Sequence, residues 1–158
     1  MIAQFFALIF GHAIAIGFFS MIWRRNSYRW RLLARQYAVD NRDDAPPITN
    51  VERRRLQNAI LLGGGLPGWN SYLGITTVGV VPQGIVLELM LPFSIGYPAL
   101  LLPFGDVEVT PRKWYLNCES VQYVMAKEPS VQIVFDEALQ NWIEVRVAAL
   151  SGSTAQSV

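Results

Sequence analysis

The chain has 158 residues, of which 52% are hydrophobic and only 16% are charged, and its formal net charge is +1. This length allows one domain of ordinary size plus a short anchor, and the charged fraction lies below the roughly 25% of soluble domains. The single cysteine, Cys118, excludes an internal disulfide and a cysteine-based zinc site.

The first 23 residues contain no Asp, Glu, Lys or Arg. As a helix they would extend about 34 Å, enough for a hydrocarbon core of about 30 Å, so residues 1–23 predict a transmembrane helix that ends at Trp23. Because the basic residues follow the apolar run, an uncleaved anchor is favoured over a signal peptide. The same asymmetry predicts a single-pass protein of the bacterial inner membrane, with its N-terminus outside and its C-terminal domain in the cytoplasm.

Small side chains recur every four residues on this predicted helix, at a spacing that lets a second helix approach closely. They are Ala3, Ala7, Gly11 and Ala15. This stripe predicts packing against an integral membrane protein complex, although small residues are also common in membrane spans.

The only histidine, His12, lies beside that stripe. A polar side chain at mid-bilayer faces protein, a cofactor or water rather than lipid. Three interpretations stay open: a hydrogen bond to a neighbouring helix, ligation of a tetrapyrrole metal through a neutral ring nitrogen, or no role. The tetrapyrrole interpretation would place the complex in photosynthesis or respiration, and the sequence requires no other cofactor.

Residues 24–39 predict a short basic helix, in which Trp30, Leu33 and Tyr37 share one face. This composition is typical of a helix at the level of lipid headgroups, and its attachment to an apolar span favours anionic lipid over nucleic acid as the polyanion. The side chains expected to contact headgroups are Arg24, Arg25, Arg29, Arg31 and Arg35. Residues 40–50, rich in Asp and ending near paired prolines, predict a linker.

Residues 51–150 predict a small β domain, because short β-type runs alternate with turn residues. The predicted strands are residues 53–62, 72–81, 84–91, 98–104, 106–115, 119–126 and 130–135. A stretch with helical spacing then runs from residue 136 to 150, and residues 151–158 predict a polar tail. The predicted fold class is one N-terminal transmembrane helix plus a mainly-β domain, a bent seven-stranded sandwich or barrel with a C-terminal capping helix.

This order of elements resembles pleckstrin-homology (PH) and GRAM-like folds. A closer resemblance, to uncharacterised bacterial single-span membrane proteins with such a β domain, is carried by "WRLLARQY" and "YLGITTVGVVPQGIVLELMLPFSIGYPALLLPFGDV", about a third of the chain. The resemblance implies the architecture and brings no chemistry with it.

Catalytic patterns are weak throughout the chain. Cys118 lacks a histidine partner, and no histidine lies near a serine of the β domain. The glycines of "LLGGGLPG" are not followed by the lysine and hydroxyl of a phosphate loop, and they predict a turn between strands. Asp106 and Glu108 are explained by the solvated face of a strand. The sequence therefore predicts no enzyme, no catalytic residue, no metal site and no nucleic-acid partner.

The segment "LPFSIGYPALLLPF" is very apolar for a region that contains a loop. Its side chains Phe93, Ile95, Tyr97 and Pro98 predict a docking patch for a protein partner or a membrane surface. The function expected from the sequence is a non-catalytic accessory or scaffold subunit of a larger membrane protein complex. The alternative is a membrane-tethered lipid- or ligand-binding module of the PH or GRAM type.

Overall fold

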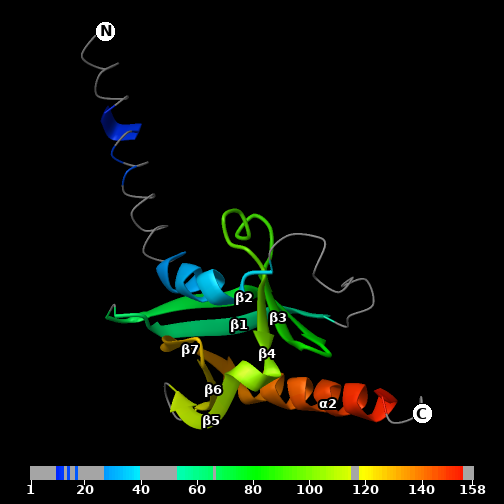
Figure 1. The fold of residues 1–158 in the computed structure, drawn as a ribbon. Coiled ribbons are helices and arrows are strands. Elements are labelled where there is room, and N and C mark those ends of the chain that lie inside the picture. Colours follow the sequence, from blue (N-terminus) through cyan, green and yellow to red (C-terminus); the bar gives the residue numbers. More distant parts are fainter. Residues whose placement is uncertain are drawn as a thin grey trace.

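The computed structural model describes residues 10–12, 14, 17, 27–39, 53–65, 67–114 and 118–154 (Figure 1). Its β domain is built from β1 (Arg53–Gly63), β2 (Trp69–Val81), β3 (Gly84–Leu89), β4 (Leu100–Pro103), β5 (Val107–Trp114), β6 (Cys118–Met125), β7 (Glu128–Asp136) and the helix α2 (Glu137–Thr154). The seven predicted strands and the closing helix are thus confirmed in number and order. The helix continues to Thr154, so the predicted polar tail begins later than residue 151.

All seven strands form one antiparallel sheet in the order β4-β3-β2-β1-β7-β6-β5. The two edge strands, β4 and β5, follow each other in the chain and are joined by the short 3-10 helix η2 (Phe104–Asp106). β4 has only four residues, and Ala38 forms a bridge with it at Leu100. Because β4 and β5 do not pair with each other, the sheet is a half-barrel, where the sequence predicted a sandwich or barrel.

Gly84 contacts β4 as well as belonging to the β2–β3 hairpin. This residue, predicted to lie in the turn, begins β3 and pairs with Pro103 of β4. A Cβ atom at Gly84 would lie 2.1 Å from the carbonyl oxygen of Leu102. The glycine is therefore needed for the close approach of β4, in addition to any role in the turn.

The core of the half-barrel receives side chains from two helical segments as well as from the sheet. Trp30 and Leu33 come from the helical residues 27–37, and Leu139 and Ile143 come from α2; all four are buried. In Figure 1 the helical residues 27–37 (blue to cyan) lie at the upper end of the half-barrel and α2 (orange to red) at its lower end, and both contribute side chains to the same core. The sheet supplies most of the remaining core, including Leu61, Tyr72, Val78, Leu87, Leu102, Tyr123, Ile133 and Phe135.

No helix among the described residues is both long and apolar enough to cross a membrane. The helical residues 27–37 include several arginines, and α2 contains acidic and basic side chains, whereas a span needs about 20 predominantly apolar residues. Most of the predicted span over residues 1–23 lies outside the described residues. The predicted fold class with a transmembrane helix, and the predicted single-pass location with the C-terminal domain in the cytoplasm, are therefore corrected: the structure is a mainly-β half-barrel with a C-terminal helix.

Candidate docking site

The helical residues 27–37 pack on the protein's own sheet. Trp30, Leu33 and Tyr37 do share one face, as predicted, and each is at most 3% exposed. The Trp30 ring meets the rings of Tyr72 and Tyr97 edge to face, with centroid distances of 5.4 and 6.1 Å. The apolar face of the helix predicted to lie at lipid headgroups is thus buried inside the protein, because aromatic side chains distant in sequence cover it.

Arg29, predicted to contact headgroups, is only 2% exposed. Its guanidinium donates hydrogen bonds to the carbonyl oxygens of Gly63 (2.8 Å) and Gly68 (2.9 Å) and to Oδ1 of Asn70 (2.8 Å). These three acceptors belong to the β1–β2 connection, so Arg29 fixes the helix to that turn.

The other basic side chains of this group differ from Arg29. Arg31 and Arg35 are exposed on the same helix, and Arg31 donates a hydrogen bond to the hydroxyl of Ser27. Arg24 and Arg25 lie outside the described residues, as does the predicted linker over residues 40–50. The structure thus separates one structural arginine from two surface arginines that the composition alone could not distinguish.

The glycine-rich segment forms the turn between β1 and β2, which confirms the interpretation from sequence. Gly63 has a φ of 79°, and a Cβ atom there would lie 2.0 Å from the carbonyl oxygen of Ser130. The next amide, of Gly64, donates to that same oxygen at 2.7 Å. Hydrogen bonds from Arg29 and to β7 therefore fix the turn, and the Gly64 N–H is occupied by the carbonyl oxygen of Ser130.

The loop over residues 90–99, between β3 and β4, is fixed at its base. The indole Nε1 of Trp30 donates to the carbonyl oxygen of Pro98 at 2.9 Å, and the amide of Val39 donates to the carbonyl oxygen of Ala99 at 2.9 Å. Within the loop, the amide of Phe93 donates to the carbonyl oxygen of Met90 at 2.8 Å. Figure 1 shows this loop projecting from the sheet beside the helical residues 27–37.

The projecting part of this loop is apolar and exposed. Leu91, Phe93 and Ile95 are 80%, 43% and 65% exposed, and Pro98 is also exposed. Tyr97, predicted as a member of the docking patch, is only 7% exposed and packs against Trp30. The structure therefore divides the predicted patch into an exposed apolar tip and a buried tyrosine that anchors it.

Leu91 is part of this tip and was missed by the sequence prediction, which placed it at the end of a strand. Pro92 is the signal that could have indicated the end of the strand before Leu91, because a proline cannot donate a backbone hydrogen bond to a neighbouring strand. β3 in fact ends at Leu89.

Burial keeps the tyrosines around this base neutral. Desolvation is the main cause that raises the pKa of Tyr72 and of Tyr97 above the usual value of 10.0, and the neighbouring Tyr97 raises that of Tyr72 further. A hydrogen bond with Ser27 and the charge of Arg31 act in the opposite direction on Tyr97. Desolvation likewise raises the pKa of Tyr123, which belongs to the same core as these two rings.

We expect stability to fall as pH rises above 10. Unfolded tyrosines ionise near their usual pKa of 10.0, while folded Tyr72 and Tyr123 hold their protons to higher pH. The contribution of these tyrosines to the free energy of unfolding is thus complete below pH 10 and is lost as pH rises toward their pKa values in the folded protein. The free energy of unfolding should fall by at most about 1.4 kcal/mol per pH unit for each tyrosine. Urea unfolding at pH 8, 9, 10 and 11 measures this slope. A Tyr123→Phe variant should show a shallower slope, and identical urea midpoints from pH 9 to 11 would contradict the prediction.

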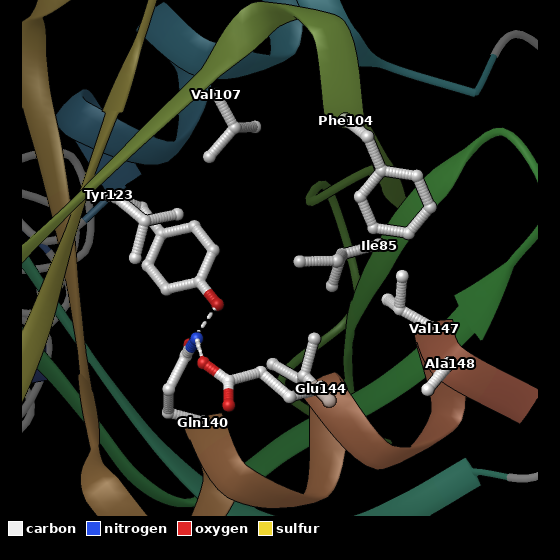
Figure 2. Close-up of a pocket in the computed structure, with 10 residues that line it drawn as sticks. Ile85, Phe104, Val107, Tyr123, Gln140, Glu144, Val147 and Ala148 are labelled. Carbon is white, nitrogen blue, oxygen red and sulfur yellow. Dashed lines mark hydrogen bonds between the residues drawn. The ribbon is translucent and has the colours of Figure 1, made fainter.

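A cleft lies between α2 and the strands β5 and β6, with a volume of about 310 Å³ (Figure 2). Its walls are mainly apolar, and Tyr123, Gln140 and Glu144 form a polar corner. The sequence prediction did not find this cleft, because its walls come from β3, η2, β5, β6 and α2.

Asp106 and Glu108, explained from the sequence by the solvated face of a strand, lie in η2 and in β5. Asp106 forms an ion pair with Lys127 at 2.7 Å, which raises the pKa of Lys127 through their hydrogen bond and charges, and Glu108 is exposed on β5. Among the described residues, no group of three His, Cys, Asp or Glu side chains could hold a metal ion. Cys118 is the first residue of β6.

The predicted contacts of the N-terminal segment remain predictions. Gly11 and His12 are exposed in the structure, and Ala3, Ala7 and Ala15 lie outside the described residues. Neither helix packing at the stripe nor a tetrapyrrole at His12 is therefore decided by the fold.

Comparison of the chain with protein-family models, with curated proteins and with solved structures finds no match. The resemblance to PH and GRAM-like proteins stays a prediction, and the functional argument rests on the geometry of this chain.

Proposed function

We propose that this protein is a non-catalytic accessory subunit that docks on a partner protein through the tip of the β3–β4 loop. The observation that supports this proposal is that one loop combines an exposed apolar tip with a base held by hydrogen bonds and ring contacts. Leu91, Phe93 and Ile95 expose large apolar surfaces, while Tyr97 and the Trp30 indole hold the base of the loop. A preorganised loop loses little conformational entropy on binding, and aromatic and aliphatic anchors of this kind contribute most of the free energy of association.

The partner should offer an apolar groove bordered by carboxylates. Residues 90–99 contain no charged side chain, and the loop projects from the sheet, so it fits a concave apolar surface. Arg31 acts electrostatically on Tyr97 at the base of the loop, and Arg35 is exposed one helical turn further on. These guanidinium groups favour acidic side chains on the rim of the partner, which would orient the encounter.

Site-specific photo-crosslinking tests this docking mode. A photoreactive residue is placed at Ile95 in the full chain, and in a second sample at Val145 of α2, which is equally exposed at 64% against 65%. We expect one partner to be crosslinked from Ile95 and not from Val145. Crosslinks of equal yield from both positions, or from Val145 alone, would argue against the loop.

Binding of the purified partner then gives the quantitative test. Ile95→Asp places a charge in the apolar contact and should weaken binding by about tenfold or more, equivalent to about 1.4 kcal/mol. Val145→Asp should bind as the unchanged chain does. Circular dichroism spectra of both variants should match the original spectrum, because neither side chain is in the core. Equal affinity of Ile95→Asp and the original chain would refute the proposed function.

A further inference from the structure

The cleft of Figure 2 lies at the gap between the two edge strands of the half-barrel. β4 ends at Pro103 and β5 begins at Val107, and α2 runs along the opening that η2 leaves between them. Seven apolar side chains from four elements face the space: Ile85, Phe104, Val107, Val109, Ile143, Val147 and Ala148. The volume of about 310 Å³ lies at the lower end of the range for small-molecule sites.

The apolar walls of the cleft are of two kinds. Ile85 and Ile143 are buried and belong to the core of the domain, so they form a fixed floor. Phe104 and Val109 are 36% and 44% exposed, and both line the same cleft. An apolar molecule in the cleft would remove their surface from water without any rearrangement of the floor, which favours binding.

One corner of the cleft is polar and carries a negative charge. The hydroxyl of Tyr123 donates to Oε1 of Gln140, and Nε2 of Gln140 donates to Oε1 of Glu144 at 2.7 Å (Figure 2). Glu144 is the one acidic or basic residue among the 10 residues that line the cleft. Because a carboxylate only accepts hydrogen bonds, this corner selects a donor, and its charge selects a cation.

We propose that this cleft binds a small cationic amphiphile, with its apolar body between the β5–β6 face and α2 and its ammonium group at Glu144. The volume of about 310 Å³ lies at the lower end of the range for small-molecule sites, so the ligand is small. An anionic amphiphile of the same length would place its carboxylate against that of Glu144. This binding site is independent of docking through the β3–β4 loop.

Calorimetric titration of the full chain at pH 7 with three probes of equal length tests the proposal. The probes are octylammonium, 1-octanol and octanoate, each kept below its aggregation concentration. We expect octylammonium to bind, 1-octanol to bind about tenfold more weakly and octanoate more weakly still. Absence of octylammonium binding, or octanoate binding as tight as that of octylammonium, would overturn the proposal.

Two variants and one matched control locate the binding. Glu144→Gln should lower the affinity for octylammonium to that for 1-octanol and leave 1-octanol unchanged. Glu108→Gln removes the same charge from a residue between Val107 and Val109 in sequence, on the opposite face of β5, and should change neither affinity. Ala148→Trp fills the cleft from the exposed side and should abolish binding of all probes. An affinity for octylammonium that Glu144→Gln leaves unchanged, or octylammonium binding that persists in Ala148→Trp, would show that the probe binds elsewhere.

Discussion

Replacing Trp30 by alanine lowers the free energy of unfolding by about 3–5 kcal/mol. Trp30 is 0% exposed, and its ring contacts the rings of Tyr72 and Tyr97, which also contact each other. Truncation leaves a large cavity there and removes the hydrogen bond from the indole to the carbonyl oxygen of Pro98. Urea unfolding followed by circular dichroism measures the loss.

The same substitution should also release the β3–β4 loop, because the Trp30 indole holds its base. Amide hydrogen exchange at Phe93 and Tyr97 should become faster under conditions in which the sheet remains protected. Tyr28→Ala on the same helix is the control, since Tyr28 is 37% exposed and should cost less than about 1 kcal/mol. Equal losses for Trp30→Ala and Tyr28→Ala would mean that the helix does not depend on this contact.

Replacing Arg29 by methionine lowers the free energy of unfolding by about 3–5 kcal/mol. Methionine occupies much of the same space but donates no hydrogen bond. The carbonyl oxygens of Gly63 and Gly68 and the side-chain oxygen of Asn70 then lose their donor in a part-buried or buried setting. Thermal unfolding monitored by scanning calorimetry measures the change.

Arg35→Met on the same helix is the matched control, because it removes the same charge from an exposed position. We expect its effect to stay within about 0.5 kcal/mol. A small effect of Arg29→Met, similar to that of Arg35→Met, would show that the guanidinium contributes charge alone and does not hold the β1–β2 turn.

The strands were predictable because their signals are local. Alternating or continuous apolar runs bounded by glycine and proline indicate strands, and glycine or proline marks the connections β1–β2, β2–β3 and β6–β7. Local signals also predicted the turn between Gly63 and Trp69 and the start of α2 after Asp136. Asp136 accepts a hydrogen bond from the amide of Leu139 at 2.7 Å, as an N-terminal cap does.

The partner of the helical residues 27–37 was not predictable in this way. Helical spacing identified its apolar face, but the groups that cover the face lie far along the chain: Arg29 and Asn70 are 41 positions apart, and Trp30 and Pro98 are 68 apart. The charge pattern therefore predicted a lipid surface where the fold supplies aromatic rings and carbonyl oxygens. A long-range contact of this kind leaves no periodic signal in a single sequence.

The docking loop and the cleft also differ in how much of each the sequence determines. The sequence by itself determined the apolar composition of residues 90–99 and the positions of the strands, because hydrophobicity and turn chemistry are properties of short segments. Only the tertiary structure decided that Tyr97 is an anchor while Leu91 is exposed, that Arg29 is buried, and that Glu144 faces an apolar cleft. Burial and cleft formation depend on which distant elements meet, and here the failure of β4 to pair with β5 leaves the gap beside α2 in which the cleft forms.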